Sequence, residues 1–266
     1  MSTLTPLRRL ALRTCAIACL AALGTVHAAT AVGDAVQLQV DATAKGTPLP
    51  HFWENMFGSG RAVLALRDDY RKDLEDVKAA TGFTYIRFHG IFDRDMGVAY
   101  RDRQGKLQFN FNYVDQVYDG LLARGVKPFV ELGFMPPELS TDPASHHDFW
   151  YHPNVMPAKD WNEWDAMVRA FLQHEIERYG IEEVRSWYFE VWNEPNLAFW
   201  GGKPEKETYY DLYDRTARVV KSVDKQFRVG TPFLRSRRLT RDRNNAIIEY
   251  VVSLLDPAHF ALHLEF

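Results

Sequence analysis

Cysteine is nearly absent from this sequence of 266 residues, and this absence limits the chemistry that the chain can perform. The two cysteines, Cys15 and Cys19, both fall in an N-terminal segment that we expect to be removed. The remaining chain then has no disulfide, no cysteine-ligated metal and no thiol nucleophile. Its stability must come from a hydrophobic core, for which a content of 46% hydrophobic residues is ordinary.

Several other features are missing. No glycine-rich phosphate loop opens a helix, so a nucleotide-binding fold has no positive support. Beyond the N-terminal segment, no apolar run is long enough to span a bilayer. The net charge of -3 gives no electrostatic reason to expect nucleic acid or an anionic membrane as a partner. Without repeats or a low-complexity linker, residues 29–266 are expected to form one domain, whose oligomeric state stays open.

The first 28 residues have the pattern of a secretory signal peptide. Three arginines form a basic start, and the apolar segment 14–26 that follows is too short to cross a membrane. Small residues ending at Ala28 predict cleavage there, and therefore a secreted or periplasmic protein with no membrane contact afterwards. A short buried helix is the alternative, and twin-arginine or lipoprotein signals match less well.

From residue 51 onward, strand-like and helix-like segments alternate, which predicts an α/β fold with a parallel sheet covered by helices. The strands carry apolar runs, as strands buried on both faces do. A doubly wound sheet and a (β/α)8 TIM barrel are both compatible with this order. The expected strands are 51–58, 83–90, 126–134, 184–196, 227–233 and 259–266; the expected helices are 68–82, 112–125, 160–180, 208–224 and 245–255; a hairpin is expected over 98–111.

The helices are predicted from apolar spacing and from their ends. In the helix from residue 112, apolar side chains recur at helical spacing from Val114 to Leu122, and Gly125 ends it. Asp68 or Asp69 is the expected N-cap of the first helix. The third helix is expected to begin with a capping box formed by Asp160 and Glu163.

Aromatic residues are abundant, with seven Trp, twelve Tyr and seventeen Phe. They can fill a core, and they are also what a sugar-binding cleft needs, because the apolar face of a pyranose stacks on an aromatic ring.

The segment "WYFEVWNEPN", residues 187–196, begins like a buried strand and ends on polar residues. Pro195 lacks an N–H and should end the strand, which leaves Asn193 and Glu194 at its carboxyl end. In α/β sheets and barrels this edge carries the catalytic residues. Neighbouring aromatic rings are expected to desolvate a glutamate there, and desolvation favours the protonated form that a general acid needs. The alternative is a structural glutamate that pairs with an arginine.

The same segment resembles the signature of glycoside hydrolase family 39, which comprises β-xylosidases and α-L-iduronidases. "HFWENMFGSGRA", "YIRFHG" and "PFVELGFMP" resemble other family segments in the right order. The resemblance covers residues 51–232 and implies a (β/α)8 barrel whose acid/base glutamate ends strand four. Counted from His51, Glu194 ends the fourth expected strand, so the strand count and the resemblance agree.

The resemblance also implies roles for individual residues. Glu194 is the expected acid/base, and Asn193 is expected to bind the substrate. Arg87 and His89 are expected to line the rim beside the second strand, although a histidine taken alone is more commonly structural. Four further residues are candidates for either the cleft or the packing beneath it: Glu131, Phe134, Trp192 and Trp200.

The implied reaction is hydrolysis with retention of configuration. One glutamate protonates the glycosidic oxygen while a second, about 5 Å away, attacks the anomeric carbon. A covalent glycosyl-enzyme forms, and the first glutamate then deprotonates the hydrolytic water. The resemblance implies a carbohydrate substrate, a β-xyloside or xylo-oligosaccharide, and no metal or organic cofactor.

The resemblance weakens after the fifth expected strand. Where the family has a small-residue stretch, this chain has residues 230–233, "GTPF", followed by a basic run at 235–243 that is typical of a solvated face. The family nucleophile ends strand seven. Glu265 precedes an aromatic residue, as that nucleophile often does, but its position fits strand six, which makes it a weak candidate. We therefore expect a barrel truncated after about six strands that by itself folds poorly or lacks activity.

Two alternatives to an exo-acting β-xylosidase stay open. An endo-acting polysaccharide hydrolase uses the same scaffold, with a through-cleft in place of a blocked pocket. A noncatalytic sugar-binding remnant would keep Arg87, His89, Asn193 and the aromatic residues but lack a nucleophile.

Overall fold

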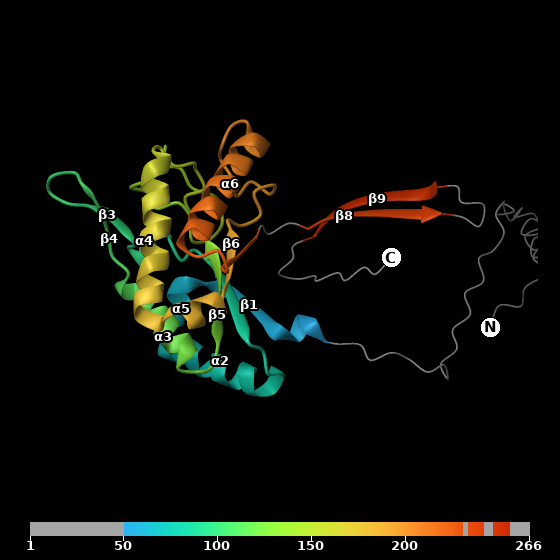
Figure 1. Ribbon diagram of the computed structural model, residues 1–266, viewed down its shortest axis with the longest axis horizontal. Helices are drawn as coiled ribbons and strands as arrows, with labels where there is room; N and C mark the ends of the chain where they lie inside the picture. Colours follow the sequence, from blue (N-terminus) through green and yellow to red (C-terminus); the bar gives the residue numbers. More distant parts are fainter. Residues whose placement is uncertain (1–50, 231–233, 242–246, 256–266) are drawn as a thin grey trace, which may run out of the picture. The chain divides into compact units, whose positions relative to one another are not determined.

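The computed structural model describes residues 51–230, 234–241 and 247–255. The expected signal peptide and the expected strand 259–266, with Glu265, lie outside the described residues. A sheet of five parallel strands forms the centre of the described chain (Figure 1). In spatial order its strands are β1 (Met56–Arg61), β2 (Tyr85–His89), β5 (Lys127–Leu132), β6 (Tyr188–Val191) and β7 (Arg228–Gly230).

The order of these strands in space follows their order in the chain. A doubly wound sheet reverses its order at a switch point, whereas a (β/α) barrel adds each strand beside the previous one. The described residues therefore have the α/β architecture of the TIM-barrel type, as the sequence predicted. Because parallel strands share one carboxyl edge, the loops that follow β1, β2, β5 and β6 meet at one rim.

Helices follow the strands, and Figure 1 shows α2, α3 and α4 gathered on one side of the sheet. Among the described residues, no helix is both long enough and apolar enough to cross a membrane. The helices are α2 (Asp68–Thr81), α3 (Asn112–Leu122), α4 (Trp161–Tyr179), α5 (Ile181–Arg185) and α6 (Glu205–Val223), with short 3-10 helices η1 (Phe52–Asn55), η2 (Ala62–Leu66) and η3 (Arg94–Met96). The expected hairpin is formed by β3 (Ala99–Arg101) and β4 (Leu107–Phe109), which pair in antiparallel fashion.

The sheet has two different faces. Ile86, Val130 and Phe189 are buried on the face that the helices cover. On the other face, the Tyr188 ring lies between those of Tyr85 and Phe129, at centroid distances of 5.1 and 5.3 Å. Two residues further along each of these strands, the same face carries charged side chains in place of rings.

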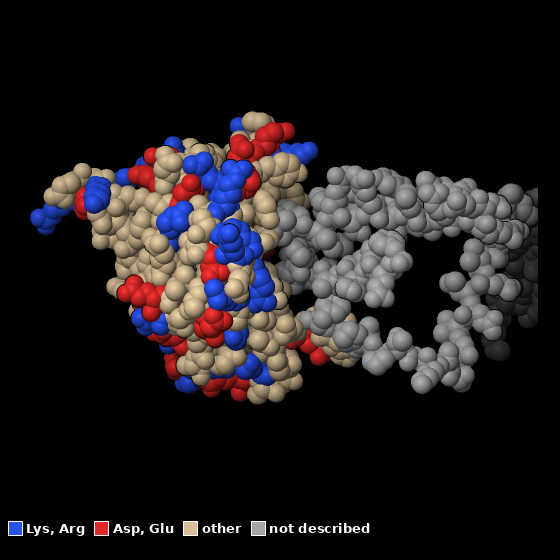
Figure 2. Space-filling view, in the orientation of Figure 1, with Lys and Arg blue, Asp and Glu red and all other residues tan. Residues whose placement is uncertain are grey.

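Charged residues are mixed over the helices. Figure 2 shows Lys and Arg side chains interspersed with Asp and Glu on this face of the described chain. Some of these charges join neighbouring helices: Arg178 of α4 pairs with Asp119 of α3, and Arg215 of α6 pairs with Asp165 of α4.

The first strand begins later than the sequence predicted. Residues 52–55 form η1, with the Glu54 N–H donating to the carbonyl of His51, and β1 starts at Met56. Met56 pairs with Tyr85, the first residue of β2, so residues before Met56 have no strand partner in that register. The predicted N-cap of α2 is also wrong. The N-cap is Arg67, because Asp68 and Asp69 both lie within the helix.

The predicted helix over 245–255 is wrong. Residues Ile247–Leu255 form strand β9, which pairs in antiparallel fashion with β8, Leu234–Arg241. The segment is rich in β-branched and aromatic residues, which favour a strand. The basic run that we interpreted as a solvated face supplies most of β8. The short helix α5 was not predicted, since five residues are too few for a periodic pattern.

Candidate active site

Asn193 and Glu194 lie at the carboxyl edge of the sheet, directly after β6. β6 is the fourth strand of the parallel sheet, which confirms the strand count made from the sequence. The strand ends at Val191, four residues before the proline, because the backbone turns sharply. Trp192 and Glu194 have positive φ values of 70° and 36°. Left-handed backbone at residues other than glycine is uncommon and is concentrated at functional sites.

Arg87 of β2 is the centre of a buried charged network. Its Nε and Nη2 atoms donate to the two carboxylate oxygens of Glu190 at 2.6 and 3.0 Å. Nη2 also donates to Asn193 Oδ1 at 2.9 Å and lies 3.2 Å from Glu131 Oε2. All four side chains are buried, and a buried charge is stable only when it is paired and hydrogen-bonded. The network therefore connects three neighbouring strands beneath the rim.

Glu131 and Glu190 face each other across β5 and β6, at paired positions in the strand register. Two carboxylates so placed repel each other unless a cation lies between them. Arg87 supplies that cation, and its bidentate contact with Glu190 is the geometry for which a guanidinium is suited.

His89 extends the network toward solvent. Its Nδ1 lies 2.6 Å from Glu131 Oε2, and its side chain is partly exposed. Burial by itself would lower the pKa of His89, but the charge of Glu131 and the hydrogen bond to it outweigh burial and raise that pKa above its usual value. His89 is therefore protonated more readily than an ordinary histidine. It lies at the carboxyl end of the second strand, as the sequence analysis expected.

The Glu194 side chain is only partly buried. Within the described residues, its carboxylate has no ion pair and no hydrogen bond. The alternative in which Glu194 pairs with an arginine therefore finds no support here, since Arg87 binds Glu190 and Glu131 instead. A partly exposed carboxylate at this edge is available to a ligand.

Asn193 is fixed by its contact with Arg87. Because Oδ1 accepts from the guanidinium, the amide Nδ2 is the atom left to donate. Nδ2 is buried and has no hydrogen-bond partner among the described residues. A buried donor without a partner calls for an explanation, and a ligand hydroxyl is the kind of acceptor that it fits.

Trp192, Phe134 and Trp200 form the apolar support below this edge. The Trp192 ring makes edge contacts with Phe134 at 5.4 Å and with Trp200 at 5.1 Å. All three side chains are buried, with relative exposure of 0 to 2%. Trp192 Nε1 also donates to the carbonyl of Phe199 at 2.6 Å, which holds the loop that carries Glu194. The packing role is therefore observed, while contact of these rings with a substrate stays a prediction.

Sequence reasoning missed Glu190 and left Glu131 undecided. The signal was available, because Arg87, Glu131 and Glu190 are charged residues inside otherwise apolar strands. What the sequence does not contain is the register that brings these strands together. In the described part of the chain, no cluster of His, Cys, Asp or Glu is arranged to hold a metal ion.

Comparison with known proteins agrees with this geometry. The sequence model described as "Glycosyl hydrolases family 39" matches residues 36–253. The chain belongs to this family. The resemblance seen in the sequence is thereby confirmed, and the buried network and rim described above are those of a family 39 chain.

Two curated relatives are β-xylosidases. The chain is 45% identical over 183 residues to the β-xylosidase of Caldicellulosiruptor saccharolyticus, covering 68% of this chain and 37% of that protein. It is 45% identical over 184 residues to the β-xylosidase of Geobacillus stearothermophilus, covering 68% of this chain and 36% of the relative. The chain thus spans little more than a third of the length of these relatives.

A solved structure of a family 39 β-xylosidase from Caulobacter crescentus is also similar. Its TM-score is 0.65 at 39% sequence identity, covering 71% of this chain and 42% of that chain. This likeness supports the fold described above independently of the strand order.

Proposed function

We propose that this protein is a retaining glycoside hydrolase that acts on β-xylosides or xylo-oligosaccharides, with Glu194 as its general acid/base. The observation that carries the proposal is the position of Glu194. Glu194 follows the fourth strand and is partly exposed, and its carboxylate has no ion pair or hydrogen bond with another described residue. The β-xylosidase relatives support the choice of substrate class.

In the first step of the proposed mechanism, protonated Glu194 donates its proton to the glycosidic oxygen as the bond to the anomeric carbon breaks. A second carboxylate, about 5 Å away in retaining enzymes, attacks that carbon and forms the glycosyl-enzyme. In the second step, Glu194, now ionised, takes a proton from water, and the water oxygen replaces the enzyme carboxylate. The nucleophile is assigned to no described residue, and Glu265 lies outside the described residues.

The neighbouring residues have supporting roles in this mechanism. Asn193 Nδ2 would donate to a sugar hydroxyl, and Arg87 holds the amide in the orientation that makes this possible. Glu131 orients His89 through the Nδ1 hydrogen bond, which leaves the Nε2 edge of the ring for the substrate. These groups are fixed before a ligand arrives, and such preorganisation is the main source of electrostatic catalysis.

The stereochemical outcome tests the reaction class. The full-length protein is incubated with an aryl β-xyloside, and the first sugar released is followed by proton NMR before it mutarotates. The proposal predicts that β-xylose appears first, because two displacements restore the configuration. Initial release of α-xylose would contradict the retaining mechanism, and binding of xylose without any turnover would favour a noncatalytic sugar-binding protein.

A further inference from the structure

Arg61, the last residue of β1, joins three loops at the carboxyl edge of the sheet. Its side chain is 18% exposed and lines a cavity of about 440 Å³. The walls of this cavity come from the end of β1, from residues 93–95 after β2, and from residues between Pro137 and Asn154 after β5. The proposed mechanism uses none of these residues, so the role of Arg61 needs its own explanation.

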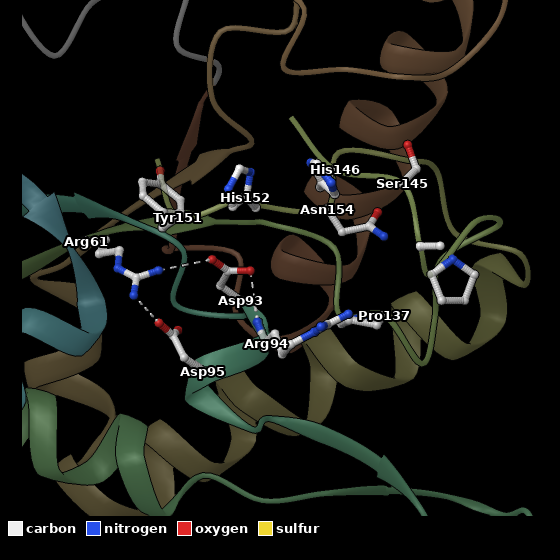
Figure 3. Close-up of a pocket in the computed structure, with 12 residues that line it drawn as sticks. Arg61, Asp93, Arg94, Asp95, Pro137, Ser145, His146, Tyr151, His152 and Asn154 are labelled. Carbon is white, nitrogen blue, oxygen red and sulfur yellow. Dashed lines mark hydrogen bonds and ion pairs between the residues drawn. The ribbon is translucent and has the colours of Figure 1, made fainter. Parts of the chain in front are cut away.

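On one side, Arg61 binds the loop that follows β2. Nη2 lies 2.6 Å from Asp95 Oδ2 and Nη1 lies 3.9 Å from Asp93 Oδ2, as the dashed lines in Figure 3 mark. Asp93 is buried, and its carboxylate also accepts from the N–H of Arg94 and caps η3. Because this short helix fixes both aspartates, they form a firm attachment point for the guanidinium.

On its other side, Arg61 lies against two rings of the loop that follows β5. Its Cζ atom is 4.7 Å from the centroid of the Tyr151 ring and 5.0 Å from that of Trp150. A guanidinium over an aromatic ring at such a distance is attracted by the electrons of the ring. Trp150 is 62% exposed, so its ring is held by few neighbours besides Arg61 and Tyr151.

Tyr151 connects this contact to the candidate active site. Its ring centroid lies 6.5 Å from that of Phe134, and Phe134 lies 6.0 Å from the His89 ring. The Tyr151 hydroxyl and Glu131 Oε1 are both buried without a hydrogen-bond partner among the described residues. Burial and then the negative charge of Glu131 raise the pKa of Tyr151, so this ring lies within electrostatic reach of the buried network.

The segment 145–152, which carries both rings, has little regular structure to hold it. None of its residues belongs to a helix or strand of the described chain. The His147 N–H donates to the carbonyl of Pro153, and the His152 N–H donates to that of Phe149. Segments with few such bonds open locally at low free energy. A contact from outside, such as that of Arg61, therefore has a large effect on how often this segment opens.

We propose that Arg61 is a positioning residue, which fastens residues 145–152 to the loop after β2 and keeps Tyr151 packed beside the buried network. The inference rests on the proposed function, because that network holds His89 and Asn193 for the substrate. Without Arg61, the segment opens more often and water reaches the network, where it weakens the electrostatic interactions. A displacement of only about 1 Å at a catalytic site can cost about 10²-fold in rate.

Amide hydrogen exchange, followed by mass spectrometry, tests the fastening without requiring turnover. In the full-length protein, Arg61→Ala should make the amides of residues 145–152 exchange at least about tenfold faster, as loss of one ion pair and one cation–π contact would give. Peptides from α4 should be unchanged. Arg61→Lys keeps a cation that can reach an aspartate and a ring, and it should restore most of the protection. Equal exchange in the wild type and Arg61→Ala overturns the proposal.

Kinetics with an aryl β-xyloside test the positioning role. Arg61→Ala should lower kcat/KM by about 10–100-fold, and Arg61→Lys should recover most of this loss. Because Arg61 acts through the ring of Tyr151, the same fold-loss should appear in a Tyr151→Phe background, which keeps the ring. In a Tyr151→Ala background, Arg61→Ala should cost less than about twofold, since coupled residues are not additive. Equal losses in the two backgrounds overturn the action through Tyr151.

Arg218→Ala is the matched control, because Arg218 also pairs with an aspartate but on the exposed surface of α6. It should leave kcat/KM and the exchange of residues 145–152 unchanged, and thermal unfolding confirms that each variant is folded. Faster exchange in Arg61→Ala with unchanged kcat/KM overturns the positioning role while the proposed function stands. A wild type without turnover overturns the proposed function and the positioning role with it, and the exchange rates then still decide whether Arg61 fastens the segment.

Discussion

Arg87 holds the charged layer of the sheet together, and its removal tests that role. Arg87→Ala leaves Glu131 and Glu190 buried opposite each other without their shared cation. Breaking one partner out of a buried ionic network typically costs 3–5 kcal/mol. We therefore expect the free energy of unfolding, measured by urea denaturation at neutral pH, to fall by about 3–5 kcal/mol.

Arg218→Ala is the control for this prediction. Arg218 also pairs with a carboxylate, Asp214, but its side chain is 77% exposed and the pair lies on the surface of α6. Exposed pairs contribute little, so a change below about 1 kcal/mol is expected. Equal effects of the two substitutions would show that the Arg87 network does not stabilise the fold.

At the residue scale, the sequence identified the groups at the strand ends and Arg87 inside β2, left Glu131 inside β5 undecided, and missed Glu190 inside β6. Asn193 and Glu194 were found because a proline and polar residues interrupt an apolar run. Glu190 was missed as a functional residue, because its partner Arg87 is 103 residues away in the chain. Only the pairing of the strands brings the two together.

At the scale of the elements, Glu175 makes the packing of α4 depend on pH. Glu175 is fully buried, and neither carboxylate oxygen has a hydrogen-bond partner among the described residues. Burial, followed by the charge of Asp115, raises its pKa well above the usual value. The native state thus holds a proton that the unfolded chain releases above its ordinary pKa near 4.5.

The sign of the pH effect follows from this difference. The stability associated with protonated Glu175 is fully present below the unfolded pKa of 4.5 and is lost as the pH rises toward the raised native pKa. Glu175→Gln cannot ionise, so at pH 8 we expect its free energy of unfolding to exceed that of the wild type by about 1–3 kcal/mol.

This advantage should shrink as the pH falls toward 4.5. Urea denaturation of the two proteins across the pH range measures this difference. If the free energies of unfolding of the two proteins stay the same distance apart at every pH, the prediction is contradicted. Glu177→Gln is the control, because Glu177 lies on the same helix but is exposed, and its curve should follow that of the wild type.

The first turn of α4 gives a second prediction at this scale. The Asp160 carboxylate accepts a hydrogen bond from the N–H of Asn162 at 2.8 Å and caps the helix. Asp160→Ala should lower the free energy of unfolding by about 1 kcal/mol, whereas Asp160→Asn keeps an accepting oxygen and should lose less. Thermal or urea denaturation that gives equal losses for the two variants would assign the effect to something other than the cap.

Long amphipathic helices were predicted well because each has its own signals. α3 and α4 show helical spacing of apolar residues and clear ends. Glu163, however, binds Arg101 of the hairpin, so the predicted capping box is formed only by its Asp160 half. The segment 245–255 was assigned to a helix and is a strand, because short apolar runs do not distinguish the two. Its pairing with β8 decides the outcome.

At the scale of the whole molecule, strand order produces the site. Five parallel strands in sequential order place their following loops along one edge, so residues from 61 to 194 contribute to one rim. The sequence predicted the alternation of strands and helices but left a doubly wound sheet open. The register, such as Glu131 opposite Glu190, decides which side chains meet, and it depends on packing over the entire sheet.

The central claim is that Glu194 protonates the leaving group. The most direct test is whether the loss of kcat/KM in Glu194→Gln depends on how much protonation the leaving group needs. In the full-length protein, kcat/KM is measured for xylobiose, whose leaving group needs protonation, and for dinitrophenyl β-xyloside, whose leaving group does not. Glu205→Gln, an exposed glutamate on α6, is the control. General acid catalysis accounts for about 10²–10⁴-fold in rate, so we predict a loss of that size for xylobiose and a loss below about tenfold for the activated xyloside. Equal losses for the two substrates would contradict the acid role of Glu194.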